Sequence, residues 1–202
     1  ISNILISQDV TRTLDAFKLM GVKIEKLKNK IIIHGMGLNS LQKPNREIQL
    51  GNSGTSARLL AGLLSAQKFN TTLLGDKSLS LRPMERITDP LKLMNAKIET
   101  SNGCLPIKIY GRELQNIEIK IDIPSAQIKS GIILAALNVK GKSTILETNI
   151  TRNHTEIMLE SFGADIDFSK KNGGTKIVIE GKKELVANNI EVPADLSSSA
   201  FF

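Results

Sequence analysis

Residues 91–98 read LKLMNAKI, and a strand-like run that ends on a glycine, 107–111 (IKIYG), follows them. The same pattern occurs twice more, at 14–24 (LDAFKLMGVKI) with 31–35 (IIIHG) and at 158–166 (MLESFGADI) with 177–181 (IVIEG). The closing glycines, Gly35, Gly111 and Gly181, lie 76 and 70 residues apart. Self-similarity at a nearly fixed spacing is typical of folds built from repeated units, so we expect three related units.

Each copy predicts an amphipathic helix, a helix C-cap and a β-hairpin. Gly21, Asn95 and Gly163 come directly after the predicted helices, where a left-handed backbone suits glycine or asparagine. Hairpin turns are predicted at 28–29, 102–103 and 173–174. Isoleucines alternate at 107 and 109 and again at 177 and 179, which indicates strands with one buried face.

The other half of the unit is a strand followed by an apolar helix. Helices are predicted over 56–64 and 129–137, each after a strand (47–50 or 117–123) and a turn of small residues. A helix as uniformly apolar as 132–137 is expected in the interior. The unit is therefore strand, helix, strand, helix, hairpin, and we expect three units around a buried helical centre with sheets outside.

These boundaries predict one three-repeat domain over 1–190, with repeats at about 1–45, 46–113 and 114–190. The first repeat lacks its opening strand and first helix. A further copy is expected to begin at Val192, so 191–202 is predicted to be the start of a crossover to a second domain. Because the chain begins at Ile1 and stops within an apolar run at Phe202, we interpret it as a piece of a longer protein.

Composition restricts the class of protein. The 202 residues are 41% hydrophobic, which fits a soluble globular protein, and no apolar stretch approaches the ~20 residues needed to cross a membrane. The single cysteine, Cys104, excludes an internal disulfide and is typical of a reducing compartment, so a cytoplasmic location is expected. A net charge of +7 indicates an anionic partner. Scattered lysines and scarce aromatics argue against a nucleic-acid groove.

The turn at 51–55 (GNSGT) is the first candidate site. Its glycines allow the backbone to approach a ligand closely, and the helix that follows presents unpaired amides and a dipole that favours an anion. Ser53 or Thr55 could cap this helix. The alternative interpretation is a simple strand-to-helix turn with a good cap, because short glycine motifs are weak evidence.

Two further segments carry candidate residues. In LRPM (81–84), Pro83 fits the first turn of a helix and would leave Arg82 beside its start, where a guanidinium can pair with phosphate or carboxylate; a solvated surface cation is the alternative. In PSAQIKS (124–130), Ser125, Gln127 and Lys129 occupy the place in the third repeat that GNSGT holds in the second. Each could instead be a cap, a first-turn polar residue or a solvated cation.

The segment 151–156 (TRNHTE) precedes the helix of the third repeat. Thr151 and Asn153 offer capping groups, and Glu156 could complete a capping box from Asn153. His154 is a possible acid-base group, but a lone histidine in the first turn of a helix is more often structural. His34 is predicted to face solvent on a strand. A nucleophilic role for Cys104 is not supported, and no spacing of His, Cys and carboxylates indicates a metal.

With these motifs the chain resembles the bacterial 5-enolpyruvylshikimate-3-phosphate (EPSP) synthase family. The order of SQDVTRTL (7–14), GNSGT, LRPM, PSAQIKS, TRNHTE and DLSSSAFF (195–202) matches the family over nearly the whole length. The resemblance implies an inside-out α/β barrel built from βαβαββ repeats, three per domain, with this chain as most of one domain. It also implies transfer of the enolpyruvyl group of phosphoenolpyruvate to the 5-hydroxyl of shikimate 3-phosphate by addition and elimination, without cofactor or metal.

Carried over by motif, the resemblance implies that Gly54 and Arg82 bind phosphoenolpyruvate. Ser125 and Gln127 would bind shikimate 3-phosphate, with Gln127 touching both substrates, and Thr151 and Arg152 would reach the shikimate phosphate. Asn52 and Thr55 would shape the turn, while Ala126 falls where some members carry serine. Gly54 also fits a role in admitting the inhibitor glyphosate.

The family's catalytic Asp and Glu would follow Phe202, and Asp195 is not one of them. The chain alone is therefore expected to be inactive, and the full-length protein is expected to be a monomer that binds neither nucleic acid nor membrane. Three rivals remain open: the related UDP-N-acetylglucosamine enolpyruvyl transferase, whose usual loop cysteine has no counterpart near Arg82; a basic repeat module that binds RNA or another polyanion; and a repeat scaffold without chemistry.

Overall fold

The predicted repeat is visible in the order of the elements in the computed structural model, which describes residues 1–171 and 173–193. The first unit contains α1 (Gln8–Leu19), β1 (Lys23–Lys26) and β2 (Ile31–His34). The second contains β3 (Ile48–Gln49), α2 (Gly54–Ser65), β4 (Thr71–Leu74), the 3₁₀ turn η1 (Leu79–Leu81), α3 (Glu85–Leu93), β5 (Lys97–Ser101) and β6 (Cys104–Tyr110). The third contains β7 (Glu118–Ile121), α4 (Ala126–Ala136), β8 (Lys142–Glu147), α5 (His154–Ser161), β9 (Asp165–Lys171) and β10 (Gly174–Glu180).

The second and third units form sheets of the same topology. Their strand orders are β3-β4-β6-β5 and β7-β8-β10-β9. In each sheet the first two strands are parallel and joined through a helix, and the other neighbours are antiparallel. The first unit contributes the two-stranded sheet β1-β2. The predicted unit of strand, helix, strand, helix and hairpin is confirmed.

The backbone conformation at the three helix C-caps explains why glycine or asparagine recurs at these positions of the sequence. Gly21, Asn95 and Gly163 have φ of +87°, +71° and +75°, so the predicted left-handed caps are confirmed. Asn102 and Gly103 also have positive φ, at 49° and 74°, as a tight hairpin turn between β5 and β6 requires.

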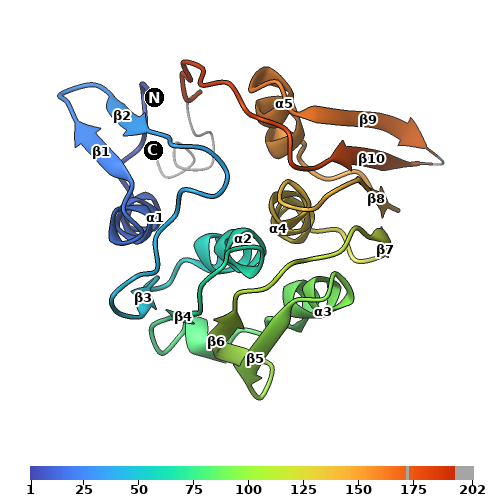
Figure 1. Cartoon of the computed structure of the whole chain (residues 1–202), viewed down its shortest axis with the longest axis horizontal. Helices are drawn as coiled ribbons and strands as arrows, with labels where there is room; N and C mark the ends of the chain where they lie inside the picture. The colour runs from blue at the N-terminus through green and yellow to red at the C-terminus, as the bar shows by residue number, and fades with distance from the viewer. Residues whose placement is uncertain (172, 194–202) are drawn as a thin grey trace, which may run out of the picture.

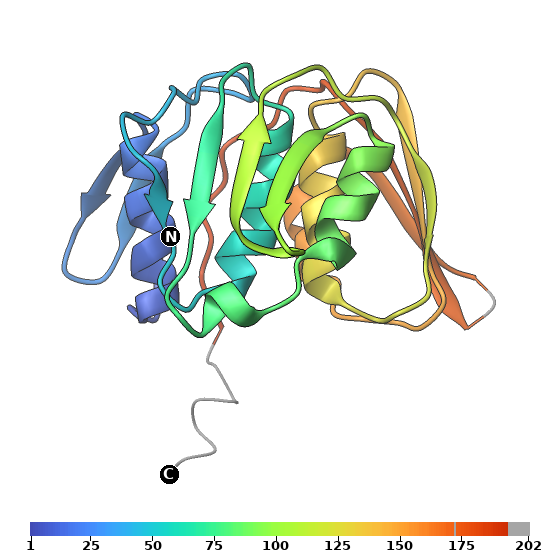
Figure 2. The same cartoon turned by 90° about the horizontal axis from the view of Figure 1, so that it is seen from below.

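Helices α2 and α4 lie at the centre, and the three sheets and helices α1, α3 and α5 surround them, as Figure 1 shows along the helix axes and Figure 2 from the side. Helices α2 and α4 pack against each other at the centre, and Ile132 and Ile133 of α4 are fully buried. Their close approach depends on glycine, because a Cβ on Gly62 would lie only 1.9 Å from the carbonyl oxygen of Gly131. The alternating isoleucines of β6 and β10 point into this core.

Some local predictions are wrong. Pro83 does not open a helix: it lies before Met84, the N-cap of α3. Both central helices begin earlier than predicted, at Gly54 and Ala126, because Ser53 and Ser125 cap them. Asp195 and the rest of 194–202, including most of the predicted further copy, lie outside the described residues. Within the described part, no helix is both long and apolar enough to cross a bilayer.

Candidate functional site

The start of α2 carries the glycine turn. Ser53 is buried, and its Oγ accepts a hydrogen bond from the amide of Ser56 at 3.2 Å, so Ser53 rather than Thr55 is the cap. This leaves Thr55 exposed in the first turn, where helix amides and the dipole favour an anion. Gly54, beside it, has no side chain and is buried.

The start of α4 lies beside it and is built in the same way. Ser125 accepts a hydrogen bond from the amide of Ile128 at 3.4 Å. Gln127 then joins the two helices: its Nε2 donates to Thr55 Oγ1 at 2.9 Å. The prediction that equivalent turns of different repeats gather on one face is therefore confirmed for these two turns.

Arg58, one turn into α2, links three of the predicted motifs. Its guanidinium donates to Gly54 O at 3.2 Å, to Gln127 Oε1 at 3.1 Å and to Pro83 O at 3.3 Å. Partial burial, followed by the positive charges of Arg82 and Arg86, lowers the pKa of Arg58. An anion bound here would relieve this repulsion, so the site is electrostatically suited to a phosphate or carboxylate.

Arg82 lies at the same place. It follows η1, is exposed, and donates from Nη2 to Asn52 Oδ1 in a short hydrogen bond. A Cβ added to Gly54 would lie 2.9 Å from Nη1 of Arg58 and 3.3 Å from Nη1 of Arg82, so both guanidinium groups lie against this glycine. The first unit adds Arg12 of α1, whose Nε would lie 3.2 Å from a Cβ on Gly51.

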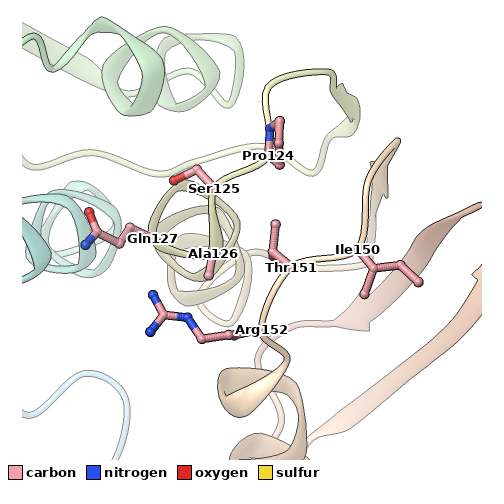
Figure 3. Close-up of a pocket in the computed structure, with 7 residues that line it drawn as sticks. All are labelled: Pro124, Ser125, Ala126, Gln127, Ile150, Thr151 and Arg152. Carbon is pink, nitrogen blue, oxygen red and sulfur yellow. The ribbon is translucent and has the colours of Figure 1, made fainter. Parts of the chain in front are cut away.

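An open hollow of about 660 Å³ lies between the start of α4 and the loop that precedes α5. This volume falls within the usual range for small-molecule sites. In Figure 3, Gln127 and Arg152 extend toward the same side of α4, whereas Ile150 points away. Seven residues line it: Pro124, Ser125, Ala126, Gln127, Ile150, Thr151 and Arg152.

Beneath the hollow lies a buried cluster of charged residues. The Nζ of Lys129 lies 3.0 Å from Glu147 Oε2 and 2.7 Å from Glu156 Oε1, and all three side chains are at most 1% exposed. Lys129 is therefore not a solvated cation. The predicted capping box is also wrong, because Glu156 faces Lys129 and Asn153 makes no side-chain cap bond. Thr151 donates its hydroxyl to Glu147 Oε1 at 2.5 Å.

The structure brings the predicted site residues of the second and third repeats to one face of the molecule. Sequence reasoning missed Arg58, although its position four residues after Gly54 on an expected helix was a usable signal. It also missed the role of Glu147, for which no local motif exists. His34 is exposed as predicted, 3.0 Å from Glu25, and His154 is exposed at the start of α5. Among the described residues, no group of three or more His, Cys, Asp or Glu could hold a metal.

Comparison with known proteins agrees with this geometry. Residues 1–202 match the family model described as EPSP synthase (3-phosphoshikimate 1-carboxyvinyltransferase). The chain is 49% identical over 203 residues to the 3-phosphoshikimate 1-carboxyvinyltransferase of Ruthia magnifica. The aligned region covers 100% of this chain and 46% of that protein. It is 45% identical over 204 residues to the protein of the same name from Oceanobacillus iheyensis, covering 47% of it.

The fold is similar to a solved structure of EPSP synthase from Acinetobacter baumannii. The TM-score is 0.92 at 46% sequence identity, over 99% of this chain and 45% of that one. The inside-out α/β repeat architecture expected from the sequence is therefore confirmed. The chain spans about half the length of the curated relatives it matches.

Proposed function

Because the chain belongs to the EPSP synthase family, we propose that the whole protein transfers the enolpyruvyl group of phosphoenolpyruvate to the 5-hydroxyl of shikimate 3-phosphate and releases phosphate. The observation that carries the proposal is the junction of α2 and α4. There Gln127 bonds to Thr55 and Arg58, and the guanidinium groups of Arg58 and Arg82 both lie against Gly54. Two anionic substrates that react with each other require such a shared site.

In the proposed arrangement, phosphoenolpyruvate lies at the glycine turn. Gly54 lets its phosphate approach the start of α2, and Arg82 supplies a guanidinium with paired donors. Shikimate 3-phosphate lies in the hollow at the start of α4, where Ser125 and Gln127 offer hydroxyl and amide groups and Arg152 reaches the 3-phosphate. Gln127, between the two turns, contacts both substrates.

The residues of this chain are proposed to bind and orient rather than to transfer protons. Addition of the hydroxyl to the enolpyruvyl double bond develops positive charge, and elimination then releases phosphate, so fixed dipoles and charges supply much of the rate. The proton-transfer groups are proposed to come from the part of the relatives' length that this chain does not match. We further propose that 1–190 form one domain, that 191–202 begin a crossover, and that the full-length protein is a cytoplasmic monomer.

The test is calorimetric titration of the full-length protein with shikimate 3-phosphate, in parallel with UDP-N-acetylglucosamine and a short RNA. Binding of shikimate 3-phosphate that is lost in Gln127→Ala, together with phosphate release on adding phosphoenolpyruvate, supports the proposal. Preference for the nucleotide sugar indicates the related transferase instead. Salt-sensitive binding of RNA without turnover indicates a polyanion-binding module.

A further inference from the structure

The three side chains of Lys129, Glu147 and Glu156, here called the Lys129 cluster, come from three different elements. Lys129 lies on α4, Glu147 ends β8 and Glu156 lies in the first turn of α5. Two carboxyl groups share one ammonium: Glu147 is hydrogen-bonded to it at 3.0 Å, whereas Glu156 lies at 2.7 Å but outside hydrogen-bonding angles. This is a costly group to bury, because both signs of charge lose their water.

Stability of the fold does not account for this cost. The residue four places after the α2 cap, equivalent to Lys129 in α4, is Ala57, and it is also fully buried. The same helical frame therefore accepts a small apolar side chain at this position. Since buried ion pairs are weak evidence for stability, a role in fixing geometry is the better explanation.

The Lys129 cluster is connected at both ends to the candidate site. On α4, Lys129 comes two residues after Gln127, and its backbone amide donates to Ser125 O at 3.1 Å. On the other side, Glu147 uses its second oxygen, Oε1, to accept the hydroxyl of Thr151. Thr151 is directly followed by Arg152, and both line the hollow.

We propose that the Lys129 cluster is a positioning device that holds the Thr151–Arg152 loop in register with Ser125 and Gln127. Thr151 then acts through Glu147, by fixing the loop that aims Arg152, and it is a positioning residue rather than a contact to substrate. This inference rests on the proposed function for its ligand, shikimate 3-phosphate, and on the contacts above for its mechanism.

The first test uses two single variants of the full-length protein and their double variant. Thr151→Val removes the hydroxyl and keeps the shape, whereas Glu147→Gln leaves one oxygen for two donors. Each is expected to weaken shikimate 3-phosphate binding by about tenfold, the scale of one hydrogen bond to a charged group. Both substitutions break the hydrogen bond between Thr151 and Glu147. The double variant is therefore expected to bind shikimate 3-phosphate with about the same affinity as the single variant that binds it less tightly. Thr151→Ser, which keeps the hydroxyl, is expected to restore most of the affinity.

The matched control is Ser130→Ala. Ser130 and Thr155 are joined by hydroxyls 2.6 Å apart, which ties α4 to α5 without involving the loop. This variant is expected to lower the melting temperature and to change the dissociation constant by no more than about twofold. A tenfold loss of binding in Ser130→Ala would show that general loosening of the two helices explains the result, and it would overturn the proposal.

Two other results count against the Lys129 cluster. Additive effects of Thr151→Val and Glu147→Gln would show that Thr151 contacts substrate directly. Wild-type affinity in Glu147→Gln would show that the hydrogen bond between Thr151 and Glu147 does not contribute to substrate binding. If Glu147→Gln does not fold, hydrogen exchange of 148–153 in ligand-free Thr151→Val decides: faster exchange supports the proposal and unchanged exchange overturns it. Because this measurement needs no ligand, it stays valid if the wild-type protein fails to bind shikimate 3-phosphate and the proposed function is lost.

Discussion

The N-terminal ends of α2 and α4 are equivalent parts of two repeats. They share a backbone arrangement, and they differ in the side chains that this arrangement presents. Each follows the first strand of its sheet, and each is capped by a serine that accepts an amide hydrogen bond three residues on. After the cap they differ at every position of the first turn. The pairs, in order, are Gly54 and Ala126, Thr55 and Gln127, Ser56 and Ile128, and Ala57 and Lys129.

The difference shows how one frame presents two kinds of binding surface. In the α2 turn, Gly54 is buried beneath the guanidinium groups of Arg58 and Arg82, and this gathering of positive charge suits a compact anion. The α4 turn offers the amide of Gln127 and an open hollow, which suits a larger polar ligand. In the proposed arrangement, the repeat fixes where the ligands lie, and the first-turn residues decide which ligand lies at each place.

The largest effect is expected on stability, at the contact between α2 and α4 that holds the two turns side by side. Gly62→Ala would place a Cβ 1.9 Å from the carbonyl oxygen of Gly131, which is backbone and cannot turn aside. Helices α2 and α4 would have to separate, at a cost of about 3 kcal/mol or more. We expect a fall in melting temperature of about 10 °C, measured by calorimetry.

Gly35→Ala is the control for this variant. Gly35 has no heavy atom within 4 Å of an added Cβ, so this substitution is expected to leave the melting temperature nearly unchanged. Equal melting temperatures for the two variants would contradict the close contact between α2 and α4.

The second effect concerns Arg58, whose hydrogen bonds bridge the turn at the start of α2 and the turn at the start of α4. Arg58→Ala removes the hydrogen bonds to Gly54 O, Gln127 Oε1 and Pro83 O, and is expected to weaken binding of both substrates by about 100-fold. Arg58→Lys keeps the charge but not the planar fork, so a loss of about tenfold is expected. Titration of each substrate measures both.

Arg112→Ala removes an equal charge near the opposite end of α2, where Gly111 packs against the backbone of Gln67 and Phe69. It is expected to bind both substrates normally. If Arg112→Ala weakens binding as much as Arg58→Ala does, net charge and not the hydrogen bonds of Arg58 controls the affinity.

A third, smaller effect is expected at the glycine of α2. In Gly54→Ala the added Cβ meets Nη1 of Arg58 at 2.9 Å and Nη1 of Arg82 at 3.3 Å, so both flexible side chains must shift within the proposed phosphoenolpyruvate site. Glyphosate, which is longer than phosphoenolpyruvate, is expected to be crowded more. The inhibition constant for glyphosate should rise by about tenfold or more, with a smaller rise in KM for phosphoenolpyruvate. An unchanged inhibition constant in the full-length variant contradicts this expectation.

The sequence could predict the frame because each repeat carries its own local signals. Left-handed caps at Gly21, Asn95 and Gly163, and alternating isoleucines in the hairpins, have nearly the same physical meaning in any context. The convergence of Gly54 with Gln127 was also predictable, since equivalent turns of stacked repeats share a face.

The Lys129 cluster could not be predicted in this way. Its partners, Glu147 and Glu156, lie 18 and 27 residues from Lys129 and come from a strand and a different helix. Only tertiary packing brings them together, and a lysine or glutamate in isolation is usually solvated. The wrong capping box at Asn153 has the same origin, because Glu156 had a stronger buried partner than the helix amides.

The smallest effect is expected at Ala126, the counterpart of Gly54 in α4. Ala126 is half-buried at the first position of α4 and lines the hollow, so Ala126→Ser adds a hydroxyl beside the proposed shikimate 3-phosphate site. One added hydrogen bond exposed to solvent contributes at most about 1 kcal/mol, so we expect affinity for shikimate 3-phosphate to rise by no more than about fivefold. The KM for phosphoenolpyruvate should not change, because this substrate is proposed to bind at the other turn. If KM for phosphoenolpyruvate changes as much as the affinity for shikimate 3-phosphate, the two turns do not divide the ligands between them.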